Sequence, residues 1–176
     1  MCIRDSFYAP ARRNVYISIP VEDRMPGDED MVGKLNLSLY GTRDAAQNWA
    51  SEYTGLLKKL GFIKGIASPC NFSQPERNIK LTVHGDDFLI AGSREDCIWL
   101  RKSMEQRYEL KFDMLGWEPD CKKEIRILNR VIRWTPNGIE YEPDQRHADT
   151  IVKELGLESC RTVSTPGTNE VKNKPG

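Results

Sequence analysis

Residues 79–91 read IKLTVHGDDFLIA, and this stretch decides the fold. Apolar and polar residues alternate up to His84, Gly85-Asp86-Asp87 interrupts the pattern, and an apolar run resumes at Phe88. Alternation with a period of two is typical of a strand with one buried face, and glycine and aspartate are favoured turn residues. The segment therefore predicts two antiparallel strands joined by a tight turn that carries two adjacent carboxylates.

Three helices and several short strands are predicted around this hairpin. Apolar residues recur every three or four positions in segments that begin near Thr42, Ser93 and Gln145. Thr42 and Ser93 are plausible N-caps, and Gly61 is a natural C-terminal stop for the first helix. Because hairpins outnumber crossovers, the pattern predicts an α+β fold with an antiparallel sheet, and not a doubly wound parallel sheet. Gly55, inside the first helix, predicts close packing or a local bend. The other predicted strands are 15–20, 34–39, 109–112, 124–134 and 139–142, the last two forming a second hairpin.

The composition is that of a globular chain. Of 176 residues, 39% are hydrophobic and 30% charged, with 26 basic residues balancing 26 acidic ones. Disorder is therefore not expected, and no apolar run reaches the roughly 18 residues that a membrane span needs. The zero net charge argues against a simple electrostatic nucleic-acid binder. Five cysteines without a C-x-x-C pair or Cys/His cluster predict neither a zinc site nor a disulfide scaffold, and favour a reducing, intracellular compartment.

Charge is distributed unevenly along the chain. The segment 21–31 carries five acids and one base, and it predicts a solvated loop. The segment 121–134 carries five bases against one acid, a net charge of +4. These bases, here called the basic stripe, could face a phosphate backbone or could form a solvated strand face. The basic stripe consists of Lys122, Lys123, Arg126, Arg130 and Arg133.

Asp86 and Asp87 are the strongest candidates for chemistry. Two adjacent carboxylates beside a core attract a cation, and oxygen ligands suit Mg²⁺. A metal pair about 4 Å apart can stabilise both the attacking and the leaving oxygens of phosphoryl transfer. Gly85 would let the backbone turn and a nucleic-acid end approach closely. The alternative is an ordinary hairpin turn, and His84 has no partner pattern that supports a metal or acid–base role.

Several short motifs, taken in order, resemble the reverse transcriptase of copia-type retrotransposons. The motifs are LYGTRDAAQNW at 39–49, Gly61-Phe62, Ser68-Pro69-Cys70, VHGDDF at 83–88 and VSTP at 163–166. Each is weak alone, but their order and spacing are specific, and the resemblance runs from about Phe7 to Pro166. It implies a polymerase palm-like segment at 7–167, with helices packed on one face of the sheet, followed by a loose polar tail at 168–176. It also implies that complete fingers, thumb and RNase H regions are missing.

The resemblance further implies roles for individual residues. Asp86 and Asp87 would be two of three carboxylates that bind Mg²⁺, or Mn²⁺ in its place, while deoxynucleotides are added to a primer on an RNA or DNA template. Leu115-Gly116 would lie near the primer end, with Gly85 and the basic stripe also contacting nucleic acid. The incoming nucleotide would be bound by Tyr40, Gly41 and Arg43.

The family also implies partners and a location. Its reverse transcriptase is made as part of a polyprotein, so integrase and RNase H would be partners in addition to the template-primer and deoxynucleotides. The expected location is intracellular, in a cytoplasmic virus-like particle or in the nucleus. No membrane partner is expected.

Some positions depart from the family pattern. His84 and Gly85 stand where the family has an aromatic and a small apolar residue. Asp44 replaces a glutamine that helps to hold the incoming nucleotide, which puts that role in doubt. Asn129 lies near a position that is usually glycine.

The largest departures from the family pattern are at the N-terminus. The third carboxylate of the family falls at Met1, its aromatic gate against ribonucleotides falls at Ser6, and Asp5 is four positions from the metal-binding one. Residues 1–6 match nothing in the family and are interpreted as a non-native extension from sequencing-adapter read-through. The resulting hypothesis is that two remaining carboxylates bind metal weakly and leave this chain inactive in isolation. The alternative is a non-catalytic remnant with at most nucleic-acid binding.

Overall fold

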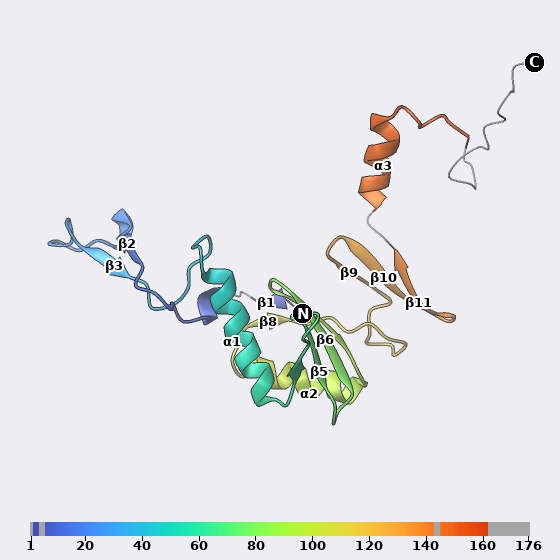
Figure 1. Cartoon of the computed structure of the whole chain (residues 1–176), viewed down its shortest axis with the longest axis horizontal. Coiled ribbons are helices and arrows are strands. Elements are labelled where there is room, and N and C mark those ends of the chain that lie inside the picture. The colour runs from blue at the N-terminus through green and yellow to red at the C-terminus, as the bar shows by residue number, and fades with distance from the viewer. Residues whose placement is uncertain (1, 4–5, 143–144, 162–176) are drawn as a thin grey trace, which may run out of the picture. The chain divides into compact units, whose positions relative to one another are not determined.

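The computed structural model describes residues 2–3, 6–142 and 145–161 (Figure 1). The chain divides into two compact units, Met1–Met114 and Leu115–Gly176, and each is described by itself. No helix in the described ranges is long and apolar enough to cross a membrane. The cysteines described with their side chains are free thiols, namely Cys70, Cys97, Cys121 and Cys160.

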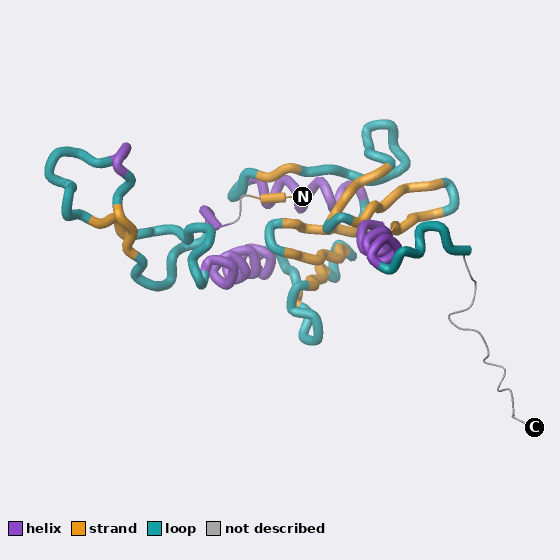
Figure 2. The backbone as a smooth tube through the Cα atoms, turned by 90° about the horizontal axis from the view of Figure 1, so that it is seen from above, coloured by secondary structure: helices purple, strands orange, loops and turns teal. Residues whose placement is uncertain are grey.

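A six-stranded antiparallel sheet forms the centre of the first unit. Its strand order is β4-β5-β6-β7-β1-β8, so the predicted hairpin 79–91 is confirmed as the two middle strands. Figure 1 labels β1, β5, β6 and β8 of this sheet, and Figure 2 shows all strands in orange. The two-residue strand β1 lies between β7 and β8 and pairs with both. The strands are β1 (Cys2–Ile3), β4 (Ile63–Lys64), β5 (Asn71–Gln74), β6 (Ile79–His84), β7 (Asp87–Ala91) and β8 (Leu110–Lys111).

Two helices, α1 (Ala45–Lys59) and α2 (Arg94–Glu105), pack on one face of this sheet. Alternate residues of β6 are buried against them, while Lys80, Thr82 and His84 are exposed on the other face. The alternation read from the sequence therefore separates the core face from the solvent face. The helices contribute Trp49, Tyr53, Leu57, Leu100 and Met104 to the core, and the sheet contributes Phe72, Ile79, Leu81, Val83 and Phe88.

The helix ends follow local capping chemistry. The N-cap predicted at Thr42 is wrong: α1 begins at Ala45 with Asp44 at the N-cap position, and the Thr42 hydroxyl instead donates to the Leu39 carbonyl in a preceding turn. The predicted stop at Gly61 is confirmed, with φ +82° in the left-handed region. Ser93 caps α2 as predicted, since its Oγ accepts the Asp96 backbone N–H. The close packing predicted at Gly55 is wrong, because an added Cβ would meet no atom within 4 Å.

A smaller antiparallel pair precedes α1. Strands β2 (Tyr16–Ser18) and β3 (Val32–Lys34) are joined by the exposed acidic segment, which contains a short 3-10 helix, η2 (Val21–Asp23). Another 3-10 turn, η1 (Ser6–Tyr8), precedes this pair. The strand predicted at 34–39 is wrong in its bounds, because β3 ends at Lys34 and the chain changes hydrogen-bond partners after Leu35, whose amide still donates to the Val15 carbonyl. The Ser38 amide instead donates to the Ala9 carbonyl over 2.7 Å.

The second unit contains a three-stranded antiparallel sheet in the order β11-β10-β9 and a helix, α3 (Gln145–Glu154). The strands are β9 (Glu124–Ile127), β10 (Arg130–Thr135) and β11 (Gly138–Glu142). The single strand predicted at 124–134 is therefore wrong: Leu128 and Asn129 form a turn with φ +50° and +60°. A glycine-favouring backbone at Asn129 explains why glycine suits that position. The motif at 163–166 and the tail at 168–176 lie outside the described residues.

Candidate active site

The turn between β6 and β7 carries the predicted carboxylates. His84 pairs with Asp87, so Gly85 and Asp86 alone form the loop. Gly85 has φ +61°. Asp86 does not have a positive φ, since the non-glycine residues with positive φ in the described ranges are Asn78, Leu128 and Asn129. Positive φ at the first loop residue only is the type II′ arrangement, which requires glycine there. Asp86 thus stands at the tip of the hairpin, and Asp87 is the first residue of β7.

Helix α1 contacts this turn through one side chain. The Trp49 indole Nε1–H donates a hydrogen bond to the Gly85 carbonyl oxygen over 3.0 Å. Trp49 is only 2% exposed, and its ring makes edge-to-face contacts with Tyr53, Phe88 and Tyr108 at centroid distances of 5.5, 6.2 and 5.3 Å. The turn is therefore joined to the hydrophobic core of the first unit.

Strand β1 lies beside the strand that carries Asp87. Cys2 is paired with Asp87 on one side and with Lys111 on the other. Met1, the position at which the resemblance predicts the third carboxylate, directly precedes this pair in sequence and lies outside the described residues. The register therefore brings the N-terminal strand next to the carboxylate pair.

The Asp86 and Asp87 carboxylates are the type of ligand that suits magnesium, but they are only two. Asp86 and Asp87 are both half-buried, and their oxygens are the ligands that Mg²⁺ prefers. Within the described ranges, no three His, Cys, Asp or Glu side chains are grouped so that they could hold a metal ion. A magnesium ion held by one or two carboxylates usually completes its coordination with water and substrate phosphates. The pair therefore suits one ion shared with a phosphate-bearing ligand.

The predicted nucleotide-binding residues lie together before α1. Tyr40 is 81% exposed, Arg43 is exposed, and Gly41 has φ +86° with open space around it. Asp44, at the position where the family has glutamine, accepts hydrogen bonds from Arg13 Nε over 2.9 Å and from Asn48 Nδ2 over 3.2 Å. The hydrogen bond from Arg13 is the main reason that the pKa of Asp44 is lowered. Asp44 is thus engaged within the protein.

The basic stripe is not a single surface. The Arg133 guanidinium pairs with Glu124 over 2.7 Å and also with Glu142. The Arg130 guanidinium lies 5.6 Å from the centre of the Tyr141 ring. Arg130 is paired with Ile127, and its neighbour Val131 is paired with Arg126. Because paired residues share a face and successive residues of a strand alternate, Arg126 and Arg130 lie on opposite faces of the sheet.

The remaining predicted nucleic-acid contacts lie together in a loop. Leu115 and Lys122 form a parallel bridge, and the Gly116 amide donates to the Lys122 carbonyl. The Lys123 ammonium donates to the carbonyl oxygens of Gly116, Trp117 and Glu118 at 2.7–3.0 Å. Lys123 therefore stabilises this loop, and its predicted contact with nucleic acid stays a prediction, as does that of the other stripe residues.

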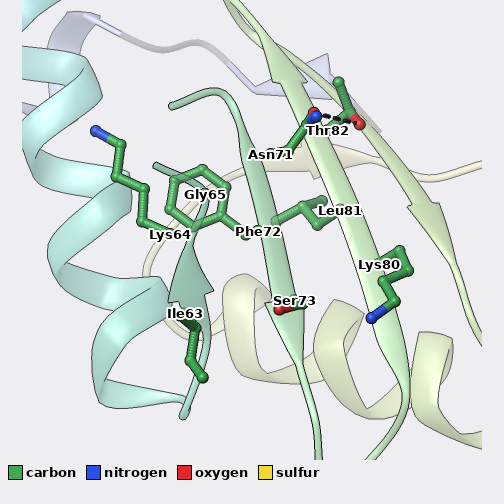
Figure 3. Close-up of a pocket in the computed structure, with 9 residues that line it drawn as sticks. All are labelled: Ile63, Lys64, Gly65, Asn71, Phe72, Ser73, Lys80, Leu81 and Thr82. Carbon is green, nitrogen blue, oxygen red and sulfur yellow. Dashed lines mark hydrogen bonds between the residues drawn. The ribbon is translucent and has the colours of Figure 1, made fainter. Parts of the chain in front are cut away.

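The solvent face of the sheet also contains a depression of about 310 Å³. Figure 3 shows Asn71 and Thr82 hydrogen-bonded at one end of it and Ser73 and Lys80 towards the other. Neither Asp86 nor Asp87 lines this depression, so it is separate from the carboxylate pair. Its lining residues are Ile63, Lys64, Gly65, Asn71, Phe72, Ser73, Lys80, Leu81 and Thr82.

Two features of the site were not predicted from the sequence. The spacing of Trp49 indicates a core residue, which it is, but nothing in the pattern indicates that its N–H reaches the turn. A second cluster joins α1 to the segment that follows α2, since Glu52 accepts hydrogen bonds from Arg107 Nε over 2.5 Å and from the Tyr108 hydroxyl over 3.2 Å. Such pairs depend on long-range packing and leave no local signal.

Comparison with known proteins agrees with these observations. A reverse transcriptase (RNA-dependent DNA polymerase) family model matches residues 4–169. The retrovirus-related Pol polyprotein from transposon TNT 1-94 of Nicotiana tabacum is 24% identical over 163 residues, which cover 90% of this chain and 12% of that polyprotein. The chain thus spans only a small part of the length of this relative, and no solved structure matches. The predicted resemblance is confirmed, and the chain belongs to the reverse transcriptase (RNA-dependent DNA polymerase) family.

Proposed function

We propose that residues 7–167 are a palm-like segment of a retrotransposon RNA-directed DNA polymerase, in which Asp86 and Asp87 bind Mg²⁺ or Mn²⁺. The observation that carries the proposal is the position of the two carboxylates. They stand at the turn of the central hairpin of an antiparallel sheet, and strand β1 pairs beside Asp87. Family membership supports the same assignment.

The residues of this chain would bind and orient the reactants. The bound metal supplies charge stabilisation for nucleotidyl transfer. Asp86 and Asp87 hold it next to the sheet, and Gly85 leaves the space above the turn open, because no atom lies within 4 Å of a Cβ built there. Tyr40, Gly41 and Arg43 bind the incoming deoxynucleotide, and Leu115-Gly116 contacts the primer end.

We further propose that the chain alone does not catalyse the reaction. Methionine occupies the position of the third carboxylate, and Asp86 and Asp87 supply only two. Two carboxylates hold one ion weakly and do not assemble a two-metal site, because that site needs ligands that position both ions. The location is proposed to be intracellular, in a virus-like particle or the nucleus.

A primer-extension assay tests this proposal. The purified chain is incubated with a primed RNA or DNA template, deoxynucleotides and Mg²⁺ or Mn²⁺. We expect no extension above the background of the Asp86→Asn variant. Extension that Asp86→Asn abolishes would show that two carboxylates are sufficient, and the proposed inactivity would then be wrong.

The second candidate is a non-catalytic remnant that binds nucleic acid at most. The observation that favours it is the small donor set at the turn. Binding to a primed duplex without binding of Mn²⁺ by Asp86 and Asp87 would support this alternative. Partners in either case would include the template-primer, and integrase and RNase H where the rest of the polyprotein is present.

A further inference from the structure

We infer that Trp49 is a positioning residue for the carboxylate turn, because its indole N–H holds the Gly85–Asp86 peptide in the type II′ orientation. The inference rests on the proposed function, since it concerns the same two carboxylates. It adds a residue of α1 that acts on the metal-binding side chains through the backbone.

Two backbone arrangements are open to a two-residue hairpin loop, types I′ and II′. They differ mainly in the orientation of the peptide between the two loop residues, because ψ of the first and φ of the second change together. In this loop that peptide joins Gly85 to Asp86. Its orientation decides the sign of φ at Asp86, and thus the direction in which the Asp86 side chain leaves the backbone.

The loop sequence favours type II′, because glycine stands at the first loop position, but it does not exclude type I′. Gly85 is compatible with both, and aspartate tolerates positive φ better than most residues. The same chain also contains the other arrangement: Leu128 and Asn129, the two loop residues between β9 and β10, both have positive φ. A contact from outside the loop therefore adds to the preference of the sequence and can hold the turn at Asp86 in one arrangement.

Trp49 makes such a contact. Its N–H donates to the Gly85 carbonyl oxygen, which belongs to the peptide whose orientation differs between the two turn types. The indole is held on several sides by Tyr53, Phe88 and Tyr108, so it has little freedom to follow a rotated carbonyl. Rotation of the peptide would leave a buried N–H without its acceptor, and an unpaired buried donor is costly. The hydrogen bond therefore favours type II′.

The variant Trp49→Phe tests this role, because phenylalanine keeps an aromatic ring and removes the N–H. Two-dimensional NMR reports the turn directly, since the amide protons of residues 85 and 86 lie close together in type I′ and far apart in type II′. We expect a weak nuclear Overhauser effect between them in the parent chain and a stronger one in Trp49→Phe. We also expect Mn²⁺ affinity to fall about tenfold, as for other residues that orient metal ligands.

Trp99→Phe is the matched control. Trp99 is half-buried on α2, its ring lies under the Arg77 guanidinium at 4.1 Å, and we expect this variant to change neither the amide contact nor Mn²⁺ affinity. A strong 85–86 contact in the parent chain, or rapid hydrogen exchange of the Trp49 indole, would overturn the inference even if Trp49→Phe fails to fold. An unchanged amide contact in a folded Trp49→Phe chain would overturn it as well. Absence of Mn²⁺ binding in the parent would contradict the proposed function, while the amide contact still decides the role of Trp49.

Discussion

Cys2 of β1 and Asp87 of β7 are paired residues on adjacent antiparallel strands. The pairing places the N-terminal strand beside the carboxylate turn, although a long stretch of sequence separates the two. Such a pairing between the first strand and the central hairpin leaves no local signal in the sequence.

The buried Tyr108 hydroxyl should make stability depend on alkaline pH. Burial, followed by the charge of Glu52, raises the pKa of Tyr108 above its usual value near 10. The folded chain keeps this proton where the unfolded chain loses it, so the contribution of Tyr108 to the free energy of unfolding is constant below about pH 10 and falls above it, by at most about 1.4 kcal/mol per pH unit. Urea denaturation between pH 8 and 11 measures the slope.

Tyr108→Phe is expected to reduce that alkaline slope, and Tyr141→Phe serves as its control. Tyr141 is 58% exposed on β11, whereas Tyr108 is 2% exposed. Some slope should remain in Tyr108→Phe, because burial also raises the pKa of Tyr53. If Tyr108→Phe and the parent chain lost stability equally steeply with rising pH, the buried Tyr108 hydroxyl would not be the cause of that loss.

The cap of α2 should contribute measurably to stability. Ser93 Oγ accepts the Asp96 N–H over 3.2 Å and donates to Asp96 Oδ2 over 2.7 Å. Ser93→Ala is expected to lower the free energy of unfolding by about 1 kcal/mol. Ser103→Ala, inside α2, removes only a bond to the Trp99 carbonyl and should change stability by less than about 0.5 kcal/mol. A smaller loss for Ser93→Ala than for Ser103→Ala would contradict the capping role.

The contribution of each arginine of the basic stripe to nucleic-acid binding can be measured separately. Arg126 and Arg130 are exposed, whereas Arg133 already pairs with two glutamates. In filter binding to a primed duplex, Arg126→Gln and Arg130→Gln should each lower the salt slope by about 1 if the residue contacts a phosphate. Arg133→Gln should change it less. A slope that none of the three substitutions alters would exclude the basic stripe as the binding surface.

The central hairpin could be predicted from the sequence because its signals are local. The alternation at 79–84, the glycine at the turn and the apolar run after it are enough to define β6 and β7. The two carboxylates were identified for the same reason. Helix α1 was also predicted, with an error of two residues at its N-cap, because the Thr42 side chain bonds within a preceding turn and Asp44 takes the N-cap position.

The errors occurred where long-range pairing decides the structure. The predicted strand at 34–39 is divided because residue 38 bonds to Ala9, which the local pattern does not indicate. The basic stripe is divided because Arg126 and Arg130 face opposite sides of the sheet and because Arg133 forms ion pairs with Glu124 and Glu142. The bond from Trp49 to Gly85 joins residues of a helix and a turn, so it could be found only in the folded chain.

Titration of the chain with Mn²⁺, followed by electron paramagnetic resonance, tests the central claim most directly. The claim is that Asp86 and Asp87 hold a divalent cation at the β6–β7 turn. We expect saturable binding that Asp86→Asn/Asp87→Asn abolishes, whereas Glu29→Gln/Asp30→Asn, an adjacent acidic pair in an exposed loop, leaves it unchanged. Binding that persists in Asp86→Asn/Asp87→Asn, or that falls equally in both double variants, would contradict the account.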